Sequence, residues 1–145
     1  MVTVLEQDLG VRYNPARVND RDFQDPYCSN PSFKDCTDLF IHGILDGPGG
    51  TCGSLPILYA AIVHRLGYPL KIAKSAGHLF VRWDDPQGQF KGIRARFNFE
   101  ASGRGLVVHP DEYYRTWPRP WNKYERKRGD LLNSLTPTKR RPSCW

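Results

Sequence analysis

The segment GGTCGSLP, residues 49–56, and the apolar run that follows it most constrain how this chain folds. Apolar side chains in the run recur at spacings of three, four and four: Leu55, Leu58, Ile62 and Leu66. This spacing defines one face of an α-helix. The sequence Gly67-Tyr68-Pro69 then predicts its end. Because Pro56 fits only in the first turn of a helix, we expect the regular helix to begin near Gly53 or Ser54.

Cys52 lies at the predicted N-terminus of this helix. Neighbouring glycines let the backbone turn tightly there, and Thr51 or a neighbour can cap the helix. Unpaired N–H groups and the positive end of the helix dipole favour a thiolate over a thiol at such a position. The segment alone is equally compatible with a buried, unreactive cysteine.

Alternation of apolar and polar residues predicts three β-strands after the helix, at 70–73, 78–83 and 94–100. The turn-forming sequence DDPQG between the last two strands favours an antiparallel hairpin. Four further segments have weaker patterns: a short helix in 1–12, an irregular loop over 14–38, a short apolar element at 38–45 and a helical turn starting at 111. We expect the aromatic segment Trp117–Trp121 to pack on the sheet.

The predicted hairpin brings His78 close to a group that can orient its ring. Directly opposed residues of an antiparallel pair have numbers with a constant sum, so a pairing of Arg82 with Arg96 places His78 opposite Glu100. A register shifted by two residues places His78 opposite Asn98 instead. In either arrangement the Cβ atom of His78 lies about 5 Å from the Cβ atom of the opposed residue. A histidine held by such an acceptor is part of a catalytic triad, although it can also simply stabilise the hairpin.

The order of Cys52 in GGTCGSLPILYAAIVHRLGYPL, His78 in AGHLFVRW and Glu100 in RFNFEAS resembles the transglutaminase-like superfamily of cysteine enzymes. The resemblance covers about residues 39–105 and extends more weakly through VRYNPAR and YYRTWPRPW, which are similar to bacterial members. It implies an α+β, papain-like fold with the catalytic helix packed on a small antiparallel sheet. Cys52 would then be the nucleophile and His78 the general base. Glu100 stands where the family usually has aspartate, so Asn98 remains an alternative third member.

The chemistry that this resemblance implies is acyl transfer to Cys52 from a peptide or a glutamine-type carboxamide. The products of this reaction would show whether the protein is a protease, a deamidase or a cross-linking transglutaminase. The similarity to bacterial members favours the first two activities. The backbone N–H of Cys52 would be one oxyanion donor, and the sequence does not identify the second. No metal or organic cofactor is required. Two alternatives are a catalytically inactive peptide-binding domain and a basic nucleic-acid-binding module.

Length and charge predict one domain with a basic C-terminal tail. The chain has 145 residues and a net charge of +6. We expect a catalytic domain over 1–123 and a mobile tail over 124–145, where basic residues cluster at 126–128 and 139–141. The end of the chain fits either a natural terminus or the edge of a domain in a longer polypeptide.

Four cysteines occur in the chain: Cys28, Cys36, Cys52 and Cys144. Without a secretion signal or a membrane-spanning apolar run, the expected location is the cytoplasm and no disulfide framework is expected. A zinc site would need Cys28 and Cys36 with His42 and Cys52, a spacing that matches no compact zinc motif. The expected partner is a protein or peptide substrate, and the chain can also be part of a longer polypeptide or a complex. A membrane is not expected as a partner, and nucleic acid is a less favoured one.

Overall fold

A computed structural model describes residues 2–17, 36–103 and 105–135 of the chain. At its centre is a five-stranded antiparallel sheet with the strand order β4-β3-β2-β1-β5. The strands are β1 (Leu70–Ser75), β2 (His78–Asp84), β3 (Arg96–Glu100), β4 (Val107–His109) and β5 (Ser134–Leu135). The mixture of helices with this sheet confirms the predicted α+β class.

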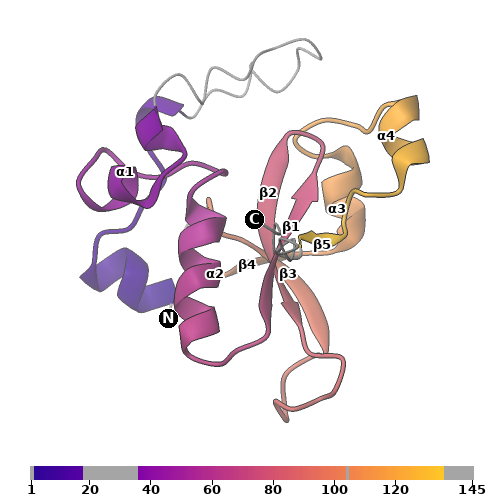
Figure 1. Cartoon of the computed structure of the whole chain (residues 1–145), viewed down its shortest axis with the longest axis horizontal. Helices are drawn as coiled ribbons and strands as arrows, with labels where there is room; N and C mark the ends of the chain where they lie inside the picture. Colours follow the sequence, from indigo (N-terminus) through magenta and orange to yellow (C-terminus); the bar gives the residue numbers. More distant parts are fainter. Residues whose placement is uncertain (1, 18–35, 104, 136–145) are drawn as a thin grey trace, which may run out of the picture.

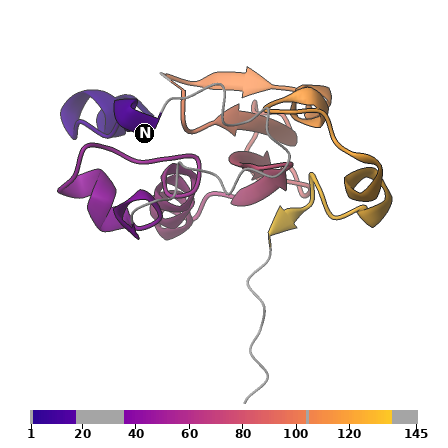
Figure 2. The same ribbon diagram turned by 90° about the horizontal axis from the view of Figure 1, so that it is seen from above.

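Helices lie on both sides of the sheet (Figure 1). Four of them are α1 (Ile41–Leu45), α2 (Leu55–Arg65), α3 (Asp111–Thr116) and α4 (Lys123–Arg128). Further helical turns of other types are η1 (Val4–Asp8), η2 (Pro15–Arg17) and η5 (Cys36–Asp38). Figure 2 shows the N-terminal segment, α1 and α2 on one side of the sheet and α3 and α4 on the other. Most of the loop expected over 14–38, including Cys28, is outside the described residues.

The predicted amphipathic helix is α2, and its bounds follow from the residues at its two ends. Regular helix begins at Leu55, with Pro56 in the first turn, where a missing N–H costs nothing. The four residues before it, 51–54, form a turn. At the other end Gly67 adopts a φ of +77°, which ends the helix. The periodic pattern therefore predicted the helix correctly to within one or two residues.

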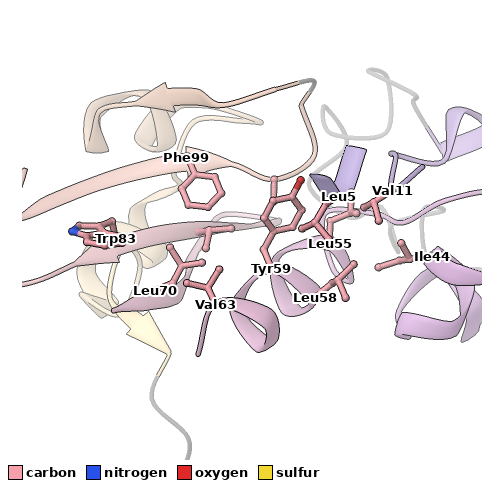
Figure 3. Close-up of a cluster of buried hydrophobic side chains, with 12 residues drawn as sticks. Leu5, Val11, Ile44, Leu55, Leu58, Tyr59, Val63, Leu70, Trp83 and Phe99 are labelled. Atoms are coloured by element: carbon pink, nitrogen blue, oxygen red, sulfur yellow. The ribbon is translucent and has the colours of Figure 1, made fainter. Parts of the chain in front are cut away.

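The larger apolar core fills the space between α2 and the sheet (Figure 3). Buried residues from α2, β1, β2, β3 and the N-terminal segment meet there: Leu5, Val11, Leu55, Tyr59, Val63, Leu70, Val81, Trp83 and Phe99. Because side chains alternate along a strand, Val81 and Phe99 point to this face while His78 and Glu100 belong to the other. One face of the sheet therefore packs against α2, and the other carries the His78–Glu100 pair.

A second core covers the opposite face of the sheet. Ala73, Phe80, Tyr114 and Leu132 are buried in it, and Trp117 and Trp121 pack against them. The rings of Phe80 and Tyr114 are stacked with their centroids 3.8 Å apart, which fixes α3 over β2. The expected packing of the 117–121 segment on the sheet is confirmed.

The β2–β3 hairpin forms as predicted, but with neither of the two predicted registers. Arg82 pairs with Asn98 rather than with Arg96, and Asp84 pairs with Arg96. The connection over 85–95 is too long for a tight turn to fix the register. A shift by an odd number of residues would expose the apolar face of a strand. The observed register therefore differs from the predicted ones by an even number of residues.

Residues beyond 123 contribute to the sheet. Ser134 pairs with Ala73 in β1, and Leu132 is 7% exposed. The backbone N–H of Leu132 donates to Lys74 O at 2.8 Å. The packed part of the chain therefore extends at least to Leu135, beyond the boundary at 123 that the basic composition suggested. Residues 136–145, with the second basic cluster, lie outside the described residues.

Candidate active site

Cys52 lies in the turn immediately before α2. Thr51 organises this turn: its backbone N–H donates to Ser54 Oγ at 2.9 Å, and its Oγ1 accepts from the backbone N–H of Gly53 at 3.1 Å. Thr51 Oγ1 also donates to Asp38 O at 2.7 Å. The N-cap residue of α2 is Ser54 and makes no side-chain cap hydrogen bond, so the expectation that Thr51 or a neighbour caps the helix is wrong. The bonds of Thr51 instead hold the turn that carries Cys52 at the start of the helix.

The side chains of His78 and Glu100 form a buried pair. His78 Nε2 lies 2.7 Å from Glu100 Oε2, and the two side chains are 1% and 8% exposed. The second carboxylate oxygen accepts from the backbone N–H of Ser102 at 3.1 Å and from Ser102 Oγ at 2.5 Å. Both oxygens of Glu100 are therefore fixed, and the carboxylate orients the histidine ring.

Glu100 uses only one of the two ring nitrogens of His78. The other, Nδ1, is buried and has no hydrogen-bond partner among the described residues. Cys52 is close enough to the imidazole to raise its pKa. Since Nε2 is occupied by Glu100, Nδ1 is the atom that is available to the thiol. The structure therefore brings together Cys52, His78 and Glu100.

Opposing effects set the protonation of this pair. Burial alone lowers the pKa of His78, but hydrogen bonds with Cys52 and Glu100 and their negative charges outweigh it and raise that pKa from 6.5 to about 9. Burial disfavours the charged form of Glu100. The hydrogen bond and charge of His78, together with the two hydrogen bonds from Ser102, outweigh this effect and leave the pKa of Glu100 below its usual value. Glu100 and Cys52 therefore both favour the protonated form of His78, which is the form produced when the imidazole accepts the thiol proton.

Asn98, the alternative third member, does not face His78. Asn98 Oδ1 accepts from Arg82 Nε at 2.6 Å, and its amide nitrogen donates to Asp111 Oδ1 at 2.7 Å. Arg82 is completely buried and also donates to Asp111 and to Leu132 O. Asn98 thus belongs to a buried network that ties α3 and the C-terminal segment to the sheet.

Two aromatic side chains that the sequence did not connect with the site pack against His78. The Trp117 ring meets the imidazole edge-to-face, with centroids 4.6 Å apart, and Tyr114 lies parallel to it at 6.3 Å. Ser102 and Tyr13 are two further neighbours of the triad that sequence reasoning missed. A serine two residues after the acid was a readable signal, whereas the approach of Tyr13 depends on tertiary structure.

The structure bears only in part on the other sequence-based expectations. Within residues 2–17, 36–103 and 105–135, no three His, Cys, Asp or Glu side chains gather as metal ligands would. Across these same ranges, no helix has the length and apolarity needed to span a membrane. Cys52 is a free, buried cysteine, while Cys28 and Cys144 are outside the described residues. The basic residues 126–128 are exposed on α4.

Comparisons of the chain with models of protein families, with curated proteins and with solved structures gave no match.

Proposed function

We propose that this protein is a cysteine-nucleophile acyl-transfer enzyme of the transglutaminase-like type, acting on a peptide or a glutamine-type carboxamide. One observation carries the proposal: the buried His78–Glu100 pair, whose free ring nitrogen is available to the thiol of Cys52. The papain-like interpretation is supported by a cysteine at the start of a helix that packs on an antiparallel sheet. Peptide hydrolysis or deamidation is favoured over cross-linking, on the resemblance alone.

In the proposed reaction, His78 takes the proton of Cys52 and the sulfur attacks the carbonyl carbon of the substrate. The negative charge that develops on the carbonyl oxygen is stabilised by the backbone N–H of Cys52. The C–N bond then breaks, and the departing amine or ammonia receives the proton from His78. Water, activated by the same imidazole, attacks the thioester; this releases a carboxylic acid and returns the proton to Cys52. Glu100 holds the imidazole and stabilises its charged form throughout.

The first test is formation of an acyl-enzyme. Incubation with p-nitrophenyl acetate should release p-nitrophenolate in a burst and add one acetyl group to Cys52, as located by peptide mass spectrometry. Cys52→Ala should abolish both signals, and His78→Gln should slow the burst by about two orders of magnitude or more. Acetylation that is independent of Cys52 would contradict the proposal.

A second assay separates the possible reactions on a protein substrate. Casein would be incubated with the enzyme and analysed for new peptide amines, released ammonia and incorporated monodansylcadaverine. These products report hydrolysis of the chain, deamidation and cross-linking, respectively. Each signal must disappear in Cys52→Ala to count as activity of this site.

A catalytically inactive peptide-binding domain is the second candidate, favoured by the burial of the thiol. Cys52 is only 3% exposed, so a substrate carbonyl needs a change of conformation to reach it. Iodoacetamide distinguishes the two candidates: an active site should alkylate rapidly at neutral pH, and a permanently closed one should not.

A further inference from the structure

Tyr13 approaches the nucleophile because the N-terminal segment pairs with the loop that precedes Cys52. Tyr13 forms a parallel bridge with Gly50, two residues before the cysteine. The backbone N–H of Gly50 donates to Arg12 O at 2.9 Å, and the backbone N–H of Asn14 donates to Gly50 O at 2.8 Å. These bonds on both sides of Tyr13 fix its Cα relative to the start of α2.

Gly49 makes this close approach possible. Its φ is +135°, and an added Cβ would lie 2.7 Å from Arg12 O and 2.9 Å from Asn14 N. Both contacts are to backbone atoms, which cannot move aside. Only glycine therefore fits at this position, and the Gly49-Gly50 pair holds the Tyr13 segment against the nucleophile loop.

Residues on both sides of Tyr13 in the sequence also hold the N-terminal segment in place. Val11 is 4% exposed in the main core, and its backbone N–H donates to Leu5 O at 2.8 Å. Asn14 is 3% exposed, and its Oδ1 accepts from the backbone N–H of Ala16 at 3.0 Å. The ring of Tyr13 is half-buried against the same core. These contacts fix the backbone on both sides of Tyr13 next to the loop that carries Cys52.

The pairing with Gly50 places Tyr13 beside the loop that carries Cys52. Its phenol group is close enough to Cys52 for the backbone N–H and the side chain of that residue to affect its pKa. Burial, followed by the charge on Cys52, raises the pKa of Tyr13 above its usual value. The phenol therefore keeps its proton at neutral pH and is available as a hydrogen-bond donor.

We infer that Tyr13 is a further catalytic residue of the proposed reaction, with its hydroxyl acting as the second hydrogen-bond donor to the oxyanion. In the resting structure the phenol group lies near the backbone N–H of Cys52. When a carbonyl oxygen enters, that N–H and the Tyr13 O–H both donate to it. No proton is transferred from Tyr13, because hydrogen bonding alone stabilises the developing charge. This inference rests on the proposed function.

The test compares two reactions of the same sulfur. Acetylation by p-nitrophenyl acetate passes through a tetrahedral oxyanion, whereas alkylation by iodoacetamide displaces iodide and forms none. Tyr13→Phe keeps the ring and removes only the hydroxyl. We expect it to slow acetylation of Cys52 by about tenfold to a thousandfold, the range found for loss of one oxyanion donor. Its alkylation rate should stay within about twofold of wild type. Tyr124→Phe, at a residue 79% exposed on α4, is the matched control and should change neither rate.

The outcomes separate this inference from the proposed function. If the wild-type protein forms no acetyl-Cys52, the proposed function fails and the role of Tyr13 fails with it. If the wild type is acetylated but Tyr13→Phe reacts at the same rate or faster, only the role of Tyr13 is overturned. Equal slowing of acetylation and alkylation also overturns it, because the hydroxyl would then only position the thiol. Circular dichroism and the melting temperature of each variant verify that it is folded.

Discussion

His78 and Glu100 are in contact at 2.7 Å although they are not opposed in the β2–β3 ladder. Continuation of the observed register would place Glu100 opposite Phe80, so the triad pair is diagonal. Cβ atoms of diagonal neighbours are about 7–8 Å apart, compared with about 5 Å for opposed residues. The additional methylene of glutamate provides the reach that this diagonal requires. The diagonal pairing is a physical reason for glutamate where the family resemblance implies aspartate.

We therefore predict that Glu100→Asp impairs the proposed reaction of Cys52 although it preserves the charge. Shortening the side chain should break its hydrogen bond with His78 and leave the imidazole poorly oriented. The acetylation rate of Cys52 should fall by about two orders of magnitude, and Glu100→Gln should lower it by two to four. Burst kinetics with p-nitrophenyl acetate measure both variants.

Asn98→Ala is the comparison for this prediction. Since Asn98 bonds Arg82 and Asp111, its loss should destabilise the fold without selectively slowing acetylation of Cys52 in the folded protein. A folded Asn98→Ala protein that loses acetylation while Glu100→Asp retains it would show that Asn98, and not Glu100, orients the histidine.

The pH dependence of stability should report the same pair. Burial lowers the pKa of His78, but its bonds to Cys52 and Glu100 raise it overall to about 9, above the unfolded value of 6.5. A group whose pKa is raised by folding contributes its full stabilisation below pH 6.5 and loses it as the pH rises through about 9. Glu100, with its pKa lowered, contributes fully above pH 4.5 and loses this stabilisation as the pH falls through its folded pKa.

Urea denaturation of wild type and His78→Gln across this range tests the prediction. The difference in their free energies of unfolding should be largest between about pH 5 and pH 6.5 and should shrink steadily toward pH 9. A difference that stays constant from pH 6.5 to pH 9 would mean that folding does not raise the pKa of His78.

The sequence predicted the helix and strands that have a clear periodic pattern of apolar residues. It missed the strands that form only because a neighbouring strand pairs with them. Helix α2 and strands β1, β2 and β3 have clear periodicities, and all four were found. Strand β4 has three residues and β5 has two, too few for alternation to be read. These two strands form because β4 pairs with β3 and β5 pairs with β1.

The candidate site was predictable to a similar extent. Cys52, His78 and Glu100 were identified from local sequence and resemblance, and the structure brings them together. The register was wrong because no short turn fixes it, yet the triad pair survives because glutamate reaches diagonally. Tyr13 was missed because it meets the site through backbone pairing with Gly50, a contact that no local pattern encodes.

Arg82 should be a major determinant of stability. It is fully buried and donates to Asn98 Oδ1 at 2.6 Å, to Asp111 Oδ1 at 2.7 Å and to Leu132 O. Arg82→Met would leave these acceptors unpaired and should lower the free energy of unfolding by about 3–5 kcal/mol. Arg82→Lys retains the charge but loses the fork of donors, so it should also destabilise the protein.

Chemical denaturation measures these variants, with Arg96→Met as the control at an exposed position on the neighbouring strand. That substitution should change the free energy of unfolding by less than about 0.5 kcal/mol. Equal effects of Arg82→Met and Arg96→Met would show that the buried network contributes little.

The C-terminal boundary of the packed domain should lie beyond residue 123. A chain ending at 123 lacks β5, the buried Leu132 and the acceptor Leu132 O of Arg82. Loss of one buried leucine alone costs about 2–5 kcal/mol, so the melting temperature should fall by about 10 °C or more. A chain ending at 135 retains all three features. Its melting temperature and its Cys52 alkylation rate should match the full chain, because the basic, proline-containing sequence that it lacks has little apolar surface to bury. Equal stability of the two shortened chains would show that β5 and Leu132 are dispensable and would restore the boundary at 123.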